Sequence, residues 1–443
     1  MIMQKKNKIE AANVMSDREY GTRILAKGCE VSEDSFKSRL NGNDLIVGGS
    51  GAGKTGSYVT PNLIRLMNSM VVADTKGLLV KKYGDYLRKK GFKVVCIDFV
   101  HPERSAHYNI LDEVRWYETE AIDEEGKKVK KKKYSQQDLR EIARLLIPDG
   151  QDDEPFWELS ARSVLLSLMA YVLETADEED RNMDSVISAY EQLSEECFEG
   201  NRDRNWPGVS FFELLGKEHP HSFAYRSYRK YKGIFTSEKT WSSIEQFVSN
   251  SIEILSFDEM EPFTKHASDI RLADIGRERT VVFVNVSDNR RSMDMMVNIF
   301  YTQLFQALMN EADSHEDGKL EVPVRIVLDD FANNVFIPDF DKIISTIRSR
   351  QISTSIILQD LSQLEGMYKK AHARTIMSNC DHKIFIGGQD DAETADYVAD
   401  IAGCLPESVK NLELGKAWIV ERGGKPRLCD VVEPYSMDIL LKE

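Results

Sequence analysis

The chain reads Gly48-Gly-Ser-Gly-Ala-Gly-Lys-Thr55 directly after a short apolar run, Leu45 to Val47, and before a helix-like stretch. This is the full pattern GxxxxGK(S/T) in the strand–loop–helix setting that the pattern requires. Glycines let such a loop curl, so that successive backbone N–H groups surround a phosphate. Lys54 is expected to reach the β- and γ-phosphates, and the Thr55 hydroxyl to hold Mg²⁺. The sequence therefore predicts a P-loop that binds ATP through Gly48, Gly49, Ser50, Gly51, Ala52, Gly53, Lys54 and Thr55.

Two carboxylates follow a second apolar run, at Arg325-Ile-Val-Leu-Asp-Asp330. A P-loop needs another metal ligand at the end of a second buried strand, and this run supplies one. Asp329 is expected to orient the water shell of Mg²⁺, and Asp330 to polarise the attacking water. The alternative is an ordinary acidic strand end or helix cap.

Gln359 and Arg348 lie on either side of a third apolar run. Gln359 ends Ser355-Ile-Ile-Leu358, where a side chain could sense the γ-phosphate. Arg348 lies on the connection that leads into this strand, from which it could reach the nucleotide of a neighbouring subunit. The plainer alternatives are a hydrogen-bonded glutamine at the edge of the core and a surface arginine.

Three other features leave alternatives open. Asp74-Thr-Lys-Gly77 follows a strand and could form a tight left-handed turn or a loop on the catalytic face. Trp157 is expected to be a core residue at a helix start rather than a platform for stacking bases. The lysines between 127 and 133 follow the acidic residues 123–125, so a solvated hairpin or loop is favoured over direct contact with phosphates.

Short apolar runs alternate with helix-like connections, which is typical of an α/β fold with a mostly parallel sheet. Strands are expected at 45–47, 70–73, 94–97, 280–286, 325–328, 354–358, 383–386 and 417–420. Between the two halves, four helices are expected at 136–146, 156–174, 183–193 and 237–255. The predicted domains are an N-terminal segment 1–40, a nucleotide-binding domain 41–134 plus 271–443, and an all-α insert 135–270.

Composition limits the classes of protein that remain. The 443 residues carry a net charge of −15, which excludes a protein that coats nucleic acid with its whole surface. DNA handling would need basic side chains gathered on one surface or in a channel. The six cysteines lie far apart, as in reduced cytosolic proteins, and the longest apolar run, 163–173, is too short to span a bilayer and is expected to be a buried helix.

These motifs together resemble the coupling ATPases of type IV secretion and conjugation systems, the TraG/TraD-like family. The resemblance starts near Tyr20 and covers nearly the whole chain. Besides the P-loop it rests on an ordered series: 58–62 (YVTPN), 71–77 (VVADTKG), 108–111 (YNIL), 156–157 (FW), 328–333 (LDDFAN), 347–350 (IRSR), 357–364 (ILQDLSQL), 378–381 (SNCD) and 393–395 (ETA).

The resemblance implies a RecA-like core with an inserted all-α domain, assembled as a hexameric ring with ATP between subunits. It implies Lys54 and Thr55 as phosphate and Mg²⁺ ligands, Asp329 as the Walker B acid, and Asp330 at the position of the catalytic carboxylate. Arg348 matches the arginine that acts across the subunit boundary, and Gln359 matches the phosphate-sensing glutamine. The family typically has glutamate where Asp330 stands, so the hydrolysis rate is the property that this departure affects.

The implied activity is that of an ATPase of the DNA translocase type. Its expected partners are a relaxase or relaxase–DNA complex bound by the insert, single-stranded DNA, and components of the secretion channel. Transmembrane helices are typical of the family and absent from this sequence, so the chain either lacks its anchor or docks on a separate membrane protein. It is then expected in the cytoplasm at the inner face of the cell membrane, as a homo-hexamer when assembled, with a monomer in isolation as the open alternative.

Two other functions are compatible with the same residues. One is a nucleotide-gated recruitment adaptor with slow hydrolysis, which the Asp330 position and the acidic charge favour. The other is a DNA-packaging or segregation ATPase of the same structural class, which the position of the insert disfavours.

Overall fold

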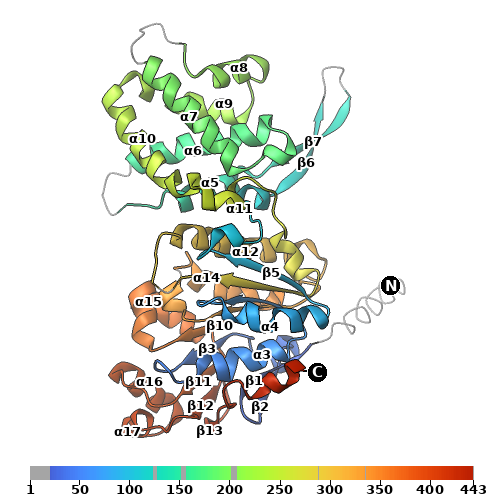
Figure 1. Cartoon of the computed structure of the whole chain (residues 1–443), viewed down its shortest axis with the longest axis vertical. Coiled ribbons are helices and arrows are strands. Elements are labelled where there is room, and N and C mark those ends of the chain that lie inside the picture. The colour runs from blue at the N-terminus through green and yellow to red at the C-terminus, as the bar shows by residue number, and fades with distance from the viewer. Residues whose placement is uncertain are drawn as a thin grey trace, which may run out of the picture. The chain divides into compact units, whose positions relative to one another are not determined.

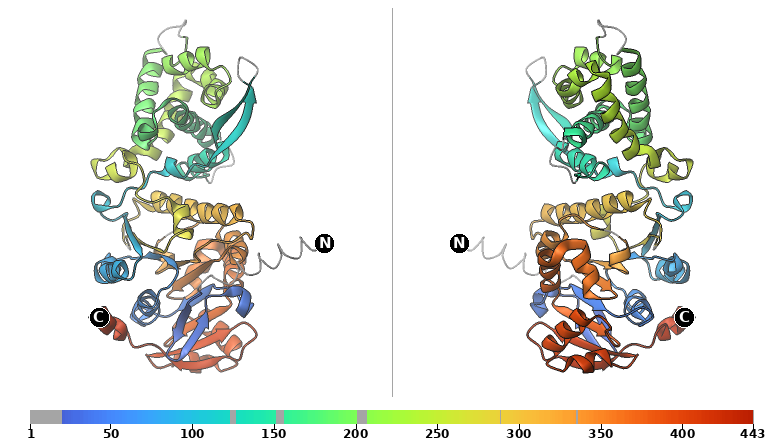
Figure 2. Two further views of the ribbon diagram at one scale, coloured as in Figure 1. Left: turned by 90° about the vertical axis from the view of Figure 1, so that its right-hand side faces the viewer. Right: turned by 90° about the vertical axis from the view of Figure 1, so that its left-hand side faces the viewer.

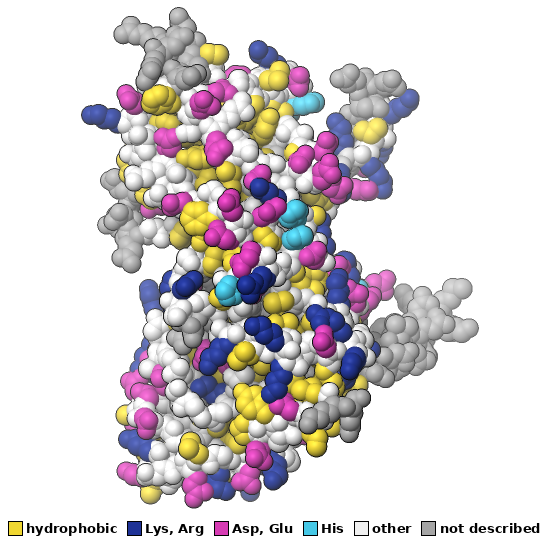
Figure 3. All heavy atoms as spheres, viewed as in Figure 1, with side chains coloured by type: hydrophobic (Ala, Val, Ile, Leu, Met, Phe, Trp, Pro, Cys, Tyr) yellow, Lys and Arg dark blue, Asp and Glu magenta, His cyan; other side chains and the backbone are white. Residues whose placement is uncertain are grey.

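The structure is a computed structural model, and it describes residues 20–122, 127–150, 156–200, 207–287, 289–334 and 336–442. The chain divides into two compact units. Unit 1 contains Met1–Cys96, Leu272–Arg291 and Tyr301–Glu443, and unit 2 contains Ile97–Arg271 and Ser292–Phe300. In both units, basic and acidic side chains are interspersed over the face shown in Figure 3.

A nine-stranded sheet forms the centre of unit 1 (Figure 1). Its order is β13 (Arg427–Asp430), β12 (Lys416–Glu421), β11 (His382–Ile386), β3 (Asp44–Val47), β10 (Ile352–Leu358), β9 (Val324–Leu328), β4 (Ser69–Ala73), β8 (Thr280–Asn285) and β5 (Lys93–Asp98). The central pairs from β11 to β8 are parallel, whereas β12 and β13 are antiparallel to their neighbours. These strands confirm the α/β fold with a mostly parallel sheet.

Parallel register brings three chain segments to one edge of this sheet. Val47 of β3 lies beside Leu358 of β10, and Leu328 of β9 lies beside Ile356 of β10. Because all three strands run in the same direction, the residues that follow them meet at their carboxyl ends. The P-loop follows β3, Gln359 follows β10 and Asp329 follows β9.

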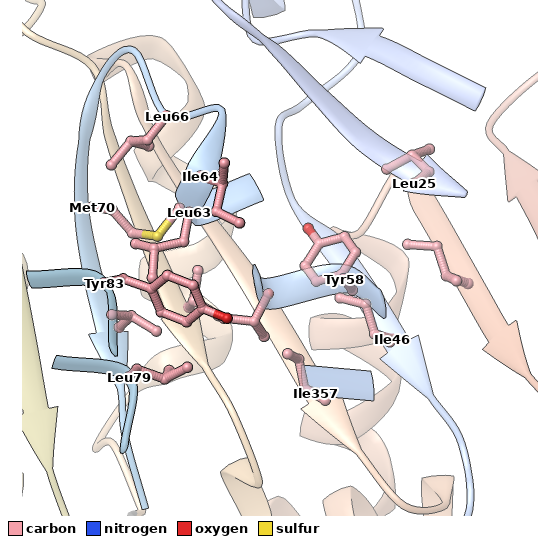
Figure 4. Packing of buried hydrophobic residues seen from close by; sticks show 14 of the residues in the cluster. Leu25, Ile46, Tyr58, Leu63, Ile64, Leu66, Met70, Leu79, Tyr83 and Ile357 are labelled. Atoms are coloured by element: carbon pink, nitrogen blue, oxygen red, sulfur yellow. The ribbon is translucent and has the colours of Figure 1, made fainter. Parts of the chain in front are cut away.

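Helices and a small antiparallel sheet complete unit 1. The small sheet pairs β1 (Thr22–Ala26) with β2 (Cys29–Ser32). The helices are α2 (Ser35–Ser38), α3 (Thr60–Ile64), α4 (Leu78–Lys89), α12 (Asp294–Ser314, which begins in unit 2), α13 (Phe331–Asn334), α14 (Phe340–Thr346), α15 (Leu361–Ser378), α16 (Ala392–Ala402) and α17 (Pro406–Lys410). Figure 4 shows the core between them, where Leu63 of α3, Leu79 and Tyr83 of α4, and Ile46 of β3 are fully or almost fully buried.

Unit 2 consists of helices and one hairpin. The hairpin pairs β6 (Trp116–Ile122) with β7 (Lys128–Tyr134), and it extends away from the helices of its own unit (Figure 2). The helices are α5 (Gln136–Leu146), α6 (Phe156–Thr175), α7 (Met183–Gly200), α8 (Ser210–Glu218), α9 (Phe223–Tyr231), α10 (Glu238–Ile252) and α11 (Glu261–Thr264). Among the described residues only α6 is long and apolar enough to cross a membrane, and 61% of that stretch is buried inside the protein.

The units divide the chain at a different place from the predicted domains. Residues 97–134 belong to unit 2, because their contacts lie there: Asn109 donates to the Arg181 carbonyl at 2.8 Å, and Arg115 pairs with Asp138 at 2.6 Å. The segment assigned to the N-terminus contributes β1 to unit 1, where the buried Arg23 joins the main sheet by an ion pair.

Candidate functional site

The P-loop leaves β3 with the backbone shape that its glycines allow. Gly51 and Gly53 have φ values of 77° and 86°, a region that L-residues with side chains rarely adopt. Gly48 lies so close to β11 that a Cβ there would be 2.9 Å from the Ile386 carbonyl oxygen. Any side chain at Gly48 would therefore push the loop away from the sheet edge that supports it.

Lys54 is held inside its own loop. Its ammonium donates to the carbonyl oxygens of Gly48 at 2.5 Å and Gly49 at 3.1 Å. Burial lowers the pKa of Lys54, although the carboxylates of Asp330 and Asp329 oppose that effect. A positive charge that has lost much of its water is a strong ligand for an added phosphate.

Thr55 and Asp329 bring two oxygen atoms together at the mouth of the loop. The Thr55 hydroxyl donates to Asp329 Oδ2 at 2.6 Å, although the two residues are 274 positions apart in the sequence. Burial raises the pKa of Asp329 to about 6, against the lowering effect of the Thr55 hydrogen bond. Mg²⁺ in triphosphate sites is bound by one or two protein oxygens together with phosphate oxygens and water, so this pair fits the ion.

Asp330 lies beside this pair in a strained conformation. Its φ is 49°, in the left-handed region, and its N–H donates to Asp329 Oδ1 at 3.0 Å. A non-glycine residue in that region costs on the order of 1–2 kcal/mol, and such strain often accompanies functional positions. The bend directs the chain away from β9 immediately after Asp329.

Gln359 lies between the P-loop and the Asp329 position, because β10 runs between β3 and β9. It is half-buried, and its N–H donates to Gln363 Oε1 at 3.0 Å. The next residue, Asp360, caps α15 through the Gln363 N–H and raises the pKa of Lys54 electrostatically. Sequence reasoning did not select Asp360; its position directly after Gln359 at the same strand end was the available signal.

Arg348 lies at the opposite end of β10, in a 3-10 turn that precedes the strand. Its guanidinium donates to the Ser35 carbonyl at 3.0 Å and lines a pocket with Arg65 and Arg325. The structure therefore brings Lys54, Thr55 and Asp329 together and leaves Arg348 at the far edge of its own sheet.

The structure also decides between the alternatives left open for the segment 74–77 and for Trp157. Asp74 caps α4, accepting from the N–H groups of Leu78, Leu79 and Val80, and Gly77 has a φ of 60°, so this segment is a left-handed turn at the functional edge of the sheet. The expectation that Trp157 is a core residue is wrong. Its side chain is exposed at the start of α6 and packs edge-on against the exposed ring of Phe156.

The lysine-rich segment forms the expected hairpin. Lys128 pairs with Glu120 at 3.0 Å, and Lys130 pairs with Glu118 at 2.7 Å across the two strands. The acidic part of the sequence at 123–125 lies outside the described residues. Two of the lysines are thus matched by glutamates on the facing strand.

Comparison with known proteins places this geometry in a family. Residues 2–405 match the family described as type IV secretory system conjugative DNA transfer. Protein VirD4 of Agrobacterium fabrum is 24% identical over 365 residues, which are 82% of this chain and 49% of that protein, so the chain spans about half the length of this relative.

Solved structures show the same fold. The coupling protein TrwB, without ligand, superposes with a TM-score of 0.61 at 14% identity over 94% of this chain and 89% of that one. TrwB has also been solved with ADP and Mg²⁺, with a TM-score of 0.61 at 15% identity over 94% and 90% of the two chains. VirB4 of Thermoanaerobacter pseudethanolicus gives 0.54 at 13% identity over 96% and 99%. The fold is therefore the RecA-like P-loop fold, and the chain belongs to the type IV secretory system conjugative DNA transfer family.

Proposed function

We propose that this protein is an ATP-driven coupling protein that brings a relaxase–DNA substrate to a type IV secretion channel and translocates single-stranded DNA. The observation that carries the proposal is the contact between Thr55 and Asp329 at the mouth of the P-loop. It joins the two oxygen ligands that a Mg²⁺-triphosphate requires, with Lys54 buried beside them. Family membership supplies the conjugative context.

In this proposal the chain's own residues bind and orient the nucleotide. The amides of residues 48–53 and the Lys54 ammonium hold the phosphates, while Thr55 and Asp329 hold Mg²⁺, which neutralises charge that develops during phosphoryl transfer. Asp330 orients and polarises the attacking water. Gln359, at the end of β10 between β3 and β9, contacts the γ-phosphate. Arg348, at the far edge of the sheet, serves the nucleotide of a neighbouring copy in a homo-hexamer.

The remaining parts of the proposal concern partners and place. The helical segment 135–270 would recognise the relaxase or relaxase–DNA complex. The protein would work in the cytoplasm at the inner face of the cell membrane, through channel components and a membrane-anchoring partner. TrwB is a bacterial conjugative coupling protein, which supports the conjugative setting of this proposal.

A second candidate is a nucleotide-gated adaptor that recruits the relaxase and hydrolyses ATP slowly. The observation that favours it is Asp330, because its side chain is one methylene shorter than the glutamate of the family pattern and is held on a strained backbone. A shorter carboxylate places its oxygen farther from the attacking water and slows proton transfer.

ATP turnover measured with and without single-stranded DNA, over a range of protein concentrations, tests the proposal. A motor with an arginine supplied in trans should turn over faster with DNA and with rising concentration, and both Lys54→Ala and Arg348→Ala should abolish this activity. Lys54→Ala should also lose Mg²⁺-ATP affinity, whereas Arg348→Ala should keep it. Full ATP affinity with slow turnover that DNA leaves unchanged would select the adaptor. Absence of Mg²⁺-dependent ATP affinity in the folded wild type would overturn both.

A further inference from the structure

The last described segment of the chain lies directly against the P-loop. After β13 the chain turns back, and residues 432–442, here called the tail segment, reach α3 (Figure 1). Gly53 and Gly56 make this approach possible, because a Cβ on Gly56 would lie 2.8 Å from Pro434 Cβ, and one on Gly53 would lie 3.3 Å from Pro434 Cγ. The Tyr435 N–H also points to the Gly56 carbonyl oxygen at 3.5 Å.

The tail segment is anchored at this position by charge and burial. Asp438 accepts a hydrogen bond from the Tyr83 hydroxyl at 2.8 Å and pairs with the Lys82 ammonium at 2.5 Å, both on α4. Apolar side chains on either side of Asp438 pack against the core cluster of unit 1: Met437, Leu440 and Leu441. These contacts fix the segment on the C-terminal side of the residues that touch the P-loop.

Tyr435 is the residue whose conformation calls for an explanation. Its φ is 61°, in the left-handed region, although a tyrosine gains nothing locally from that conformation. The Lys82 ammonium lies 4.3 Å from the ring centroid, a cation–π contact that holds the ring in place, yet the side chain remains 49% exposed. A large aromatic ring is thus kept at the surface beside Gly56 at a conformational cost.

The position of this ring matches one end of the proposed ligand. A P-loop holds the β- and γ-phosphates near its lysine, and the α-phosphate beside the first residues of the following helix. The ribose and base extend outward from that point. Gly56 is the residue after Thr55, so Pro434 and Tyr435 lie on the nucleoside side of the loop.

We propose that Pro434 and Tyr435 form the wall of the nucleotide site against which the ribose and base of ATP pack, with Lys82 and Asp438 as positioning residues. The inference rests on the proposed function, since it assigns the nucleoside end of the same site. The tail segment lies beyond residue 405, where the family match ends. An exposed ring face suits any purine, because stacking depends on the π-face rather than on base edges.

Two ligands distinguish the wall from the P-loop itself. Mg²⁺-ATP contains the nucleoside, whereas Mg²⁺-tripolyphosphate contains only the phosphates. Affinities are measured by calorimetry for wild type, Tyr435→Ala, Tyr435→Phe and a matched control, Tyr117→Ala, which removes a tyrosine of the same 49% exposure in unit 2. Circular dichroism and thermal unfolding check that each variant is folded.

Tyr435→Ala should bind Mg²⁺-ATP about tenfold more weakly, the loss that one base–aromatic stack produces. Its affinity for Mg²⁺-tripolyphosphate should equal that of wild type. Tyr435→Phe, which keeps the ring, and Tyr117→Ala should bind both ligands normally.

Each other outcome would contradict the proposed wall. Unchanged ATP affinity in Tyr435→Ala would show that the ring does not contact the nucleoside, and it would leave the P-loop assignment intact. Tighter binding of both ligands would mean that the tail segment covers the site and competes with nucleotide. Equal weakening of both would assign Tyr435 to the loop's structure. If wild type bound neither ligand, the proposed function would fail, and the wall with it.

Discussion

Replacing Asp44 with asparagine should lower the unfolding free energy of unit 1 by about 3 kcal/mol, the lower end of the range for breaking a buried ion pair. Asp44 is the first residue of β3, the strand that leads into the P-loop, and it has no exposed surface. Its carboxylate accepts hydrogen bonds from Arg23 at 2.8 and 2.9 Å, from Arg325 at 3.3 Å, and from the Tyr58 hydroxyl.

The size of the effect depends on which carboxylates remain near Arg23 and Arg325 once Asp44 is neutral. Arg325 keeps Glu33 at 2.7 Å, whereas the distance from Arg23 to Glu33 is 3.9 Å. One buried guanidinium would therefore lose its close neutralising partner, while asparagine would still supply one acceptor oxygen. A loss of about 3 kcal/mol lowers the folding equilibrium constant more than a hundredfold, because each 1.4 kcal/mol is about a factor of ten.

Urea unfolding gives this difference, and hydrogen exchange of peptides covering β3 and β10 locates it in unit 1. The control is Glu30→Gln, which removes an ion pair to Arg65 at 2.6 Å whose side chains are 42% and 40% exposed. Exposed pairs contribute about 0–1 kcal/mol, so the control should change little. If Asp44→Asn lost no more stability than Glu30→Gln, the buried cluster would not hold β3 in place.

Three further changes have definite expected outcomes. Burial raises the pKa of Asp329 to about 6, so ionising it disfavours the folded state, and nucleotide-free protein should lose stability as pH rises from about 4 through 6. Asp329→Asn should flatten that dependence in urea midpoints measured across this range; an unaltered slope would contradict the assignment. Asp74→Ala should cost about 1–2 kcal/mol and speed hydrogen exchange in the first turn of α4, because three N–H groups lose their cap; unchanged exchange there would speak against the capping role. Asp330→Asn should lower ATP turnover at least tenfold, since positioned bases contribute on the order of 10²–10⁴, with ATP affinity retained; turnover equal to wild type would exclude Asp330 as the base.

The sheet and the P-loop region could be predicted because their signals are local. Each of the eight expected strands is present within a few residues, from β3 at Asp44–Val47 to β12 at Lys416–Glu421. The helix predicted at 136–146 has the observed bounds, with Ser135 capping it through the Asp138 N–H. Short apolar runs bounded by polar residues give these elements a pattern that a single sequence reveals.

The elements that were missed depend on distant partners. β1 contains Arg23, which interrupts an apolar pattern and is buried only because Asp44, 21 residues away, neutralises it. β13 is a mostly exposed strand at the end of its sheet and has no apolar face. The tail segment contacts Gly53 and Gly56, from which it is separated by most of the sequence, and no local sequence pattern predicts such a contact.

Strand β10 has a consequence for communication between copies of the chain. Gln359 directly follows its carboxyl end, and the turn that holds Arg348 ends two residues before its first residue, so the seven residues of Ile352–Leu358 lie between the two side chains. Such a strand spans about 23 Å, and it is paired with β3 on one side and β9 on the other. In a ring of the proposed kind, a displacement of Gln359 by the γ-phosphate would be transmitted along β10 to Arg348. The strand would then couple the nucleotide site of one subunit to that of its neighbour.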